Sequence, residues 1–226
     1  MTSTLKPITL WGKGGPNPPK VQILLEELGL PHEVVAVPFA DIKKLPYTAI
    51  NPNGRVPSIQ DPNTGLTLWE SGAILEYLIE TYDKEHKLSF PAGSNEAYLA
   101  KQWLHFQTSG QGPYYGQAVW FIKFHSEQLP SAQERYLNEI KRVMGVLDGW
   151  LSEQEKLHGN SGDGPWLVGN KLSYADLAFL PWQAAAGRVL GERYSEDGFP
   201  TLKAWLDKMR ARPAVEKVFK VLLEAN

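Results

Sequence analysis

The chain has no cysteine among its 226 residues, and this absence removes several classes of protein at once. Disulfide scaffolds, cysteine-based zinc sites and cysteine nucleophiles are all excluded. If the protein performs thiol chemistry, the sulfur must arrive on a small molecule. Histidine is sparse as well: there are five, none of them in a His-x-x-x-His pair, so no metal site is expected.

Long apolar runs are also missing. No stretch approaches the ~20 residues that a helix needs to span a bilayer, and the N-terminus lacks the basic and apolar segments of a signal peptide. The net charge of −2 gives no electrostatic reason to bind nucleic acid or an anionic membrane. We therefore expect a cytoplasmic protein with neither of these partners, large enough to bury a core without disulfides or metals.

The first part of the chain alternates between strand and helix patterns. Apolar residues at helical spacing from Val21 to Leu28 predict one helix, and a second is expected to begin near Ser71. The turn sequence from Asp61 to Gly65 joins two strands, which must then be antiparallel, so the sheet is expected to be mixed. The four predicted strands are Ile8 to Trp11, Glu33 to Pro38, Val56 to Gln60 and Leu66 to Trp69.

The rest of the chain is predicted to be helical. We expect a mixed-sheet domain over residues 1–83, a polar linker over 84–94 and an all-helical domain over 95–226. Apolar spacing from Tyr136 to Leu151 predicts one long amphipathic helix. Ser173 and Asp176 predict a capping box at the start of another helix.

Val56 and Pro57 stand at the start of the third predicted strand. Proline has no amide hydrogen, so it interrupts a strand ladder and leaves the backbone N–H and C=O of Val56 facing outward. A peptide ligand can pair with such an edge as an added strand, and a cis bond before the proline would direct those groups at it. The alternative is a trans proline that merely begins an edge strand.

Glu70 and Ser71 lie at the start of a predicted helix, where unpaired amides and the helix dipole favour anions. Ser71 can cap the helix or donate its hydroxyl to a ligand carboxylate, and Glu70 can bind an ammonium group. The head group of an α-amino acid presents both charges. The alternative is an ordinary serine cap beside a solvated glutamate.

Asn17 lies in a loop rich in glycine and proline before the first helix, where its side-chain amide can donate to a ligand. A thiol held there would be shifted towards thiolate by donor hydrogen bonds and by the helix dipole. The alternative is that Asn17 only caps the helix. The loop is not a phosphate-binding loop, because no Gly-Lys-Ser/Thr follows.

Together these stretches resemble a cytosolic glutathione transferase over essentially the whole chain. Within that superfamily the chain resembles the fungal nitrogen-regulator (prion-type) transferase-like group and the bacterial Nu class. The resemblance implies an α+β, thioredoxin-like N-terminal domain with a mixed four-stranded sheet, followed by an all-α domain. The segments that carry it are Pro16-Asn17, Asn51 to Pro57, Trp69 to Leu75, Gln107 to Gln117, Glu134 to Tyr136, Trp166 to Gly169, Ser173 to Leu177 and Arg212 to Ala214.

The resemblance also implies roles for the residues of the site. Val56 would pair with the cysteinyl backbone of glutathione beside a cis Pro57. Glu70 and Ser71 would hold the γ-glutamyl head group. Asn17 would lie near the sulfur, where it would share the activation of the thiolate with backbone amides and the helix dipole.

Further residues are implied at the edges of the site. Lys44, and less directly Lys43, would meet the glycyl carboxylate, while Arg135 would lie over the site and serve a second glutathione or a substrate carboxylate. Tyr115 and Trp120 would border the pocket for the hydrophobic substrate. The alternative for these aromatic residues is packing in the core or at a dimer interface.

The residues and the resemblance together predict a glutathione transferase that uses glutathione as co-substrate, without a metal and as a homodimer. The electrophile is either carbon, as in detoxifying conjugation, or sulfur, as in a glutathione-dependent disulfide oxidoreductase of Nu type. A non-catalytic, glutathione-binding regulatory protein is the other alternative. One position departs from the Nu class: Gly15 stands where those enzymes carry a threonine, so one hydroxyl donor to the sulfur is missing.

Overall fold

The computed structural model describes residues 5–159 and 163–224, which form two compact units. The first unit comprises the described residues up to Glu85 together with those from Arg212 onward, and the second comprises His86–Ala211. The elements of the first unit are β1 (Ile8–Trp11), α1 (Asn17–Glu27), β2 (His32–Val35), α2 (Tyr47–Ile50), β3 (Ser58–Asp61), β4 (Leu66–Trp69), α3 (Ser71–Tyr82) and α9 (Pro213–Glu224).

The four strands of the first unit form one sheet in the order β2-β1-β3-β4. β1 runs parallel to β2, whereas β1 with β3 and β3 with β4 are antiparallel. The predicted mixed four-stranded sheet is therefore confirmed. β3 begins at Ser58 rather than at Val56, because Pro57 has no amide hydrogen and the ladder with β1 starts only after it, at Trp11 opposite Ser58.

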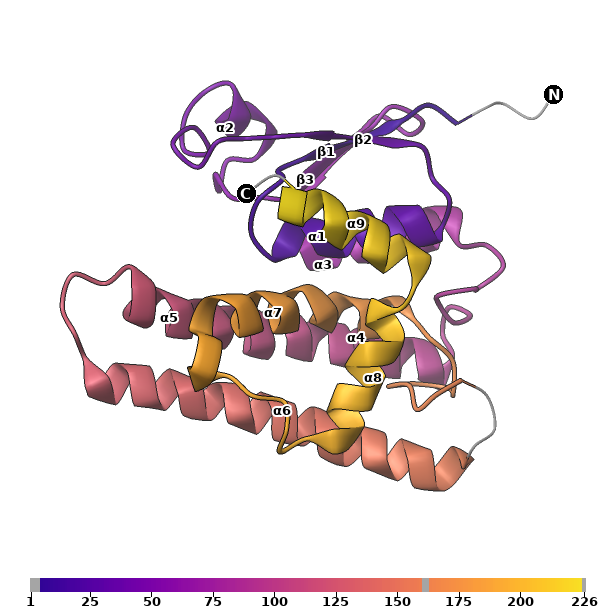
Figure 1. Cartoon of the computed structure of the whole chain (residues 1–226). Helices are drawn as coiled ribbons and strands as arrows, with labels where there is room; N and C mark the ends of the chain where they lie inside the picture. Colours follow the sequence, from indigo (N-terminus) through magenta and orange to yellow (C-terminus); the bar gives the residue numbers. More distant parts are fainter. Residues whose placement is uncertain (1–4, 160–162, 225–226) are drawn as a thin grey trace. The chain divides into compact units, whose positions relative to one another are not determined.

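The helices α1, α3 and α9 lie together on one side of this sheet (Figure 1). They bury the inward faces of the central strands, where Leu10 and Ile59 have no exposed surface. From α1, Leu24 packs into the same core, and Ile74 does so from α3; both are fully buried. The short α2 was not predicted, since four residues are too few to show a helical period.

The last helix, α9, belongs to the first unit, although a domain boundary at residue 95 predicts it in the helical domain. The guanidinium of Arg212 donates to both carboxylate oxygens of Glu27 at 2.6 and 2.8 Å, and Lys217 donates to Glu26 at 2.8 Å. Both acidic residues lie at the C-terminal end of α1. An amphipathic period indicates that a helix has a buried face, but it does not indicate which unit covers that face.

The second unit consists of helices. They are α4 (Asn95–Phe106), the π-helical segment η1 (Gln107–Gln111), α5 (Gly112–Lys123), α6 (Pro130–His158), α7 (Tyr174–Leu190), the 3₁₀ turn η2 (Gly191–Arg193) and α8 (Pro200–Arg210). The predicted long helix is confirmed as α6, whose Ile140, Val143 and Leu147 are buried. Across both units, none of the helices in the described ranges has the length and apolarity needed to cross a membrane.

The π-helical turn between α4 and α5 is held by two buried glutamines. The side-chain amide of Gln107 donates to that of Gln111 at 2.9 Å, and Gln111 donates to the backbone carbonyl of Phe179 in α7 at 3.1 Å. This bond ties the turn to the central helix of the unit. The buried amide groups of both glutamines thus have hydrogen-bond partners inside the core.

Asp176 links the start of α7 to two other parts of the second unit. Its fully buried carboxylate accepts from the amides of Ser173 and Leu167 at 2.9 Å each, from the Ser173 hydroxyl at 2.8 Å and from the Trp205 indole at 3.1 Å. The predicted capping box is present. Burial raises the pKa of Asp176 to about 6, and the four donated hydrogen bonds oppose that rise.

We expect Asp176→Asn to lower the free energy of unfolding of the second unit by about 1–3 kcal/mol at neutral pH, because the amide oxygen cannot replace a carboxylate that accepts four bonds. Chemical denaturation would measure this. Asp197→Asn is the matched control: that carboxylate is exposed and pairs with Lys203 at 3.2 Å, so its loss should lower the free energy of unfolding much less than the loss of Asp176 does.

The same residue predicts a pH dependence. Burial raises the pKa of Asp176 to about 6 in the folded protein, above the usual value of an aspartate side chain, so the folded state holds this proton more tightly. The stabilisation that this proton adds is therefore complete below about pH 4 and is lost as the pH rises through about 6, so the wild type exceeds Asp176→Asn in stability by more at pH 4 than at neutral pH. The free energy of unfolding of the wild type minus that of Asp176→Asn should decrease between these pH values. A difference that stays constant would contradict the prediction.

Candidate functional site

A cavity of about 70 Å³ lies in the first unit, where separate chain segments meet. Its volume is about twice the ~30 Å³ share of one water molecule in the liquid, so it accommodates a charged head group rather than a whole peptide. Five of the residues predicted for the site lie together here. The lining consists of Asn17, Asn51, Arg55, Val56, Pro57, Glu70 and Ser71.

The segment before β3 forms one wall of this cavity. The Val56–Pro57 peptide bond is cis, and the ladder of β3 with β1 begins only at Ser58. Directly before Val56, the backbone carbonyl of Arg55 accepts from the Tyr47 hydroxyl at 2.7 Å and from the Asn51 side chain at 2.6 Å. These two bonds fix the segment directly before Val56, which lines the cavity ahead of β3 and can serve as a preformed strand edge.

Asn51 and Arg55 line the cavity but were not predicted as site residues. Asn51 is 1% exposed, and its side-chain Oδ1 accepts from the backbone amide of Asn53 at 2.9 Å. The Asn-Pro-Asn-Gly sequence around it suggests an exposed turn, which hides this buried role. Arg55 is also part of the lining, and its position directly before the Val-Pro pair is the signal that could have identified it.

The start of α3 forms the opposite wall. Glu70 has a φ of 74°, a left-handed conformation that costs a residue with a side chain on the order of 1–3 kcal/mol and that occurs mainly where function requires it. From Glu70 to Ala73 every residue carries a backbone N–H, so the four amides that a helix start leaves without a helical partner are all present. This end can therefore bind an anion, with the buried Ser71 hydroxyl beside it.

The start of α1 differs from that of α3 because it is rich in proline. Pro16 precedes the helix, and Pro18 and Pro19 follow Asn17 within its first turn. Since proline has no amide hydrogen, Asn17 supplies the only backbone N–H among these four residues. Asn17 itself lines the cavity. This helix start is therefore a much weaker anion site than that of α3.

A lysine lies behind the α3 wall. Lys20 is only 2% exposed, and its Nζ lies 3.4 Å from the Oγ of Ser71. Burial lowers the pKa of Lys20 to about 7, while attraction to the Glu70 carboxylate acts in the opposite direction. The ammonium group can thus change its charge near neutral pH, directly beside the cavity wall.

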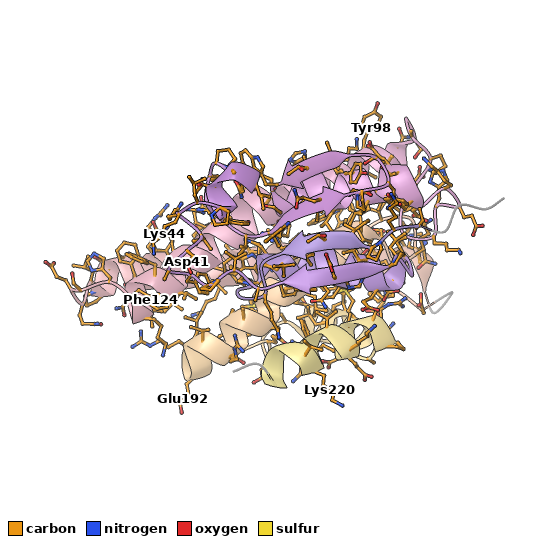
Figure 2. All side chains as sticks on the ribbon, turned by 90° about the horizontal axis from the view of Figure 1, so that it is seen from above. Asp41, Lys44, Tyr98, Phe124, Glu192 and Lys220 are labelled. Atoms are coloured by element: carbon orange, nitrogen blue, oxygen red, sulfur yellow. The ribbon has the colours of Figure 1, made fainter. Side chains whose placement is uncertain are left out.

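Lys44 does not line the cavity. It pairs with Asp41 at 3.2 Å, and both side chains are more than half exposed; Figure 2 shows them close together on the surface of the first unit. Lys43 instead donates to the backbone carbonyl of Asn53 at 2.7 Å, which brings it to the segment that leads to Val56. The predicted contact of Lys44 with a glycyl carboxylate stays a prediction.

The remaining predicted site residues lie in the second unit. Arg135 is exposed on α6, and Trp120 is half exposed on α5. Tyr115 is fully buried, and its hydroxyl donates to Gln183 at 3.2 Å, which gives it a packing role within this unit. The roles proposed for these three residues at a substrate pocket or over the glutathione site stay predictions.

The second unit also has a larger cavity of about 510 Å³. Residues of α6, such as Ile140 and Met144, form one side of it, and residues 192–195, Gly198 and Phe199 form the other. None of the predicted site residues lines it. We place the functional site at the smaller cavity, because that cavity combines two helix starts, an acidic residue and a preformed strand edge.

Comparisons with known proteins agree with this geometry. The family model of the glutathione S-transferase N-terminal domain matches residues 6–80, and that of the C-terminal domain matches residues 113–213. The Aspergillus fumigatus glutathione S-transferase-like protein tpcF is 60% identical to this chain over 94% of the chain and 95% of the relative.

Two solved structures are similar over nearly the whole chain. The glutathione transferase URE2P6 from Phanerochaete chrysosporium, solved with oxidized glutathione, has a TM-score of 0.88 and 45% identity, with 100% of both chains covered. The nitrogen regulation fragment of the yeast prion protein Ure2p has a TM-score of 0.88 and 36% identity, covering 97% of this chain and 99% of that one. The resemblance to the fungal nitrogen-regulator group is therefore confirmed.

A substitution at Gly12 tests whether the wall at Val56 is rigid. Gly12 has a φ of 109°, and a Cβ there would lie 2.5 Å from the Cβ of Val56. We expect Gly12→Ala to displace Val56 and to lower the free energy of unfolding by about 2 kcal/mol more than a control substitution. Chemical denaturation and the amide NMR shift of Val56 would measure both effects.

The matched control is Gly15→Ala. Gly15 has a φ of 76° in the same loop, but a Cβ there would meet nothing within 4 Å. The Gly15→Ala substitution therefore introduces backbone strain without a steric clash. Equal stability losses in the two variants, with the Val56 amide shift unmoved in both, would contradict a tightly packed wall.

Proposed function

Because the chain belongs to the glutathione S-transferase family, we propose that it binds glutathione with the γ-glutamyl head group in the cavity of about 70 Å³, and that it directs the thiolate of this co-substrate at an electrophile. The observation that carries the proposal is the convergence of Asn17, Val56, Glu70 and Ser71 on one cavity. Oxidized glutathione in the similar URE2P6 structure supports the same ligand.

The γ-glutamyl head group fits the start of α3. Its carboxylate is matched by four backbone amides and by the Ser71 hydroxyl, and its ammonium is matched by the Glu70 carboxylate. A zwitterion placed between opposite charges keeps favourable partners for both of its ends. The strained backbone at Glu70 supports this assignment, because such strain is retained where function requires it.

The rest of the tripeptide fits the strand edge. The cysteinyl residue would pair with the backbone N–H and C=O of Val56, as an added strand pairs with a sheet edge. This pairing leads the sulfur towards Asn17. A preformed edge reduces the entropy lost on binding, because Tyr47 and Asn51 already fix the protein side of the pairing.

The chemistry follows from the position of the sulfur. With Asn17 donating to it, the thiol releases its proton to water more readily, and the thiolate then attacks the electrophile. With an aryl chloride, an S–C bond forms, the C–Cl bond breaks and chloride leaves. Holding both reactants in register supplies further acceleration. The proline-rich start of α1 limits thiolate stabilisation, so we assign Asn17 the main part of it.

Disulfide exchange is the second candidate function. Here the thiolate of bound glutathione attacks a sulfur of a disulfide substrate, and one substrate thiolate leaves. The thiolate of a second glutathione then attacks the glutathione sulfur of the mixed disulfide, which forms oxidized glutathione and releases the second substrate thiolate. Two observations favour it: the chain supplies no thiol of its own, and a similar transferase was solved with oxidized glutathione. The homodimer and the cytoplasmic location stay proposals based on the family; light scattering would test the first and fractionation of cells the second.

Calorimetric titration with reduced and oxidized glutathione tests the ligand. We expect binding by the wild type and a rise of about 10–100-fold in the Kd for Glu70→Gln and for Ser71→Ala, since each removes a charged or polar partner of the head group. Glu33→Gln is the matched control, because Glu33 is exposed on β2. An absence of binding by the wild type would contradict the proposal of a glutathione site.

Paired assays separate the two reactions. A chloronitrobenzene measures conjugation, and hydroxyethyl disulfide measures disulfide reduction. We expect Asn17→Ala to lower kcat/KM by about 10–100-fold in whichever reaction dominates, while the Kd of S-methylglutathione changes little, because Asn17 acts on the sulfur rather than on the head group. Equal losses in affinity and rate would instead place Asn17 among the binding residues.

A further inference from the structure

Among the described residues, Lys20 is the only lysine or arginine that is buried. Its long side chain extends from the first turn of α1 to the start of α3, where Nζ lies 3.4 Å from the Oγ of Ser71. Burying an ammonium group costs free energy unless an opposite charge and hydrogen bonds compensate for the lost water. The proposed function employs Ser71 and leaves this ammonium without an assigned role.

The direction of the Lys20–Ser71 hydrogen bond depends on the proton of the lysine. An ammonium group has three donors and no acceptor, so a charged Lys20 must donate to the Oγ of Ser71. The hydrogen of the Ser71 hydroxyl is then left to point into the cavity that Ser71 lines. A neutral amine has a lone pair, and it can accept that hydrogen and turn it away from the cavity.

We propose that Lys20 is a positioning residue for the ligand carboxylate, whose charge state decides whether the Ser71 hydroxyl donates into the cavity or towards the lysine. This inference rests on the proposed function, since it takes the γ-glutamyl carboxylate as the group that receives the hydroxyl. The charged form of Lys20 is the one that binds the ligand. Binding at neutral pH therefore takes up a proton.

The charges around α1 support a proton change near neutral pH. β1 carries no charged residue, and on α9 Arg212 and Lys217 are paired with acidic residues at the other end of α1. At the α3 side, Glu70 raises the pKa of Lys20, but burial outweighs it and brings the value to about 7. A bound carboxylate adds a second negative charge beside the ammonium, so the ligand favours the protonated form.

The sign of the effect follows from this linkage. When only the protonated form binds, the apparent Kd rises in proportion to the fraction that has lost the proton. With a pKa of about 7, most molecules are protonated at about pH 6 and few at about pH 8. We therefore expect the Kd to rise by about tenfold between these two values.

Calorimetry with S-methylglutathione tests the inference on the full chain. This probe has no thiol, so ionisation of the sulfur does not contribute. We expect the wild-type Kd to rise about tenfold from pH 6 to pH 8, and the Lys20→Met variant to bind weakly at both values with a ratio near one. Titration in two buffers of different ionisation enthalpy should show proton uptake by the wild type alone.

Two further variants test the route through Ser71. In a Ser71→Ala background, Lys20→Met should cause no additional loss of affinity, because the hydroxyl that it orients is gone. Lys20→Arg keeps a charge that does not titrate in this range, so its Kd should be the same at both pH values. Circular dichroism and thermal melting confirm that each variant is folded, and the wild-type pH profile stands even if Lys20→Met does not fold.

The outcomes separate the two proposals. An absence of S-methylglutathione binding by the wild type at either pH overturns the glutathione site and this inference with it. Binding whose Kd ratio between pH 8 and pH 6 is the same in the wild type and in Lys20→Met overturns the role of Lys20 alone. Losses that add fully in the double variant contradict the route through Ser71.

Discussion

Two helices begin at the same small cavity, and the candidate site depends on this convergence. The starts of α1 and α3 bring Asn17 and Ser71 together although 53 positions of the chain separate them. Unpaired amides and the positive end of the dipole concentrate at such starts, so the cavity is electrostatically prepared before any ligand arrives. The strand edge at Val56 completes it, because two hydrogen bonds to the Arg55 carbonyl hold that segment in place. Rigid elements, rather than a mobile loop, thus position the groups.

The two helix starts differ in the number of hydrogen-bond donors that they offer, so they contribute differently to binding the ligand. α3 offers four amides and a serine hydroxyl, whereas the prolines of α1 leave Asn17 as the main donor. Binding energy is therefore concentrated on the head group of the ligand, at a distance from the reacting sulfur. An enzyme built in this way anchors its co-substrate well and relies on orientation as much as on a low thiol pKa.

Much of the fold could be predicted from the sequence, because long elements carry their own periodic signal. The buried residues of α6, the turn between β3 and β4 and the capping box at Ser173 were all predicted from local patterns. The site residues at Val56, Glu70 and Ser71 were predicted because proline and a serine-led helix start have a distinct chemistry. Burial of polar residues gave no such signal. Asn51 lies in a sequence typical of an exposed turn, and Lys20 has the appearance of a solvated lysine, yet both are buried. The position of α9 could not be predicted either, since its partners Glu26 and Glu27 lie almost the whole chain length away.

The return of α9 to the first unit has a consequence for how the protein is made. Residues 213–224 leave the ribosome after the whole of residues 86–211, so the second unit can fold while the helical layer of the first is still incomplete. Until then the apolar surface of α1 that α9 will cover is open to the surrounding solution. The sheet-containing unit is therefore synthesised first but completes its folding last. Chaperones that bind the nascent chain would encounter this unit without α9.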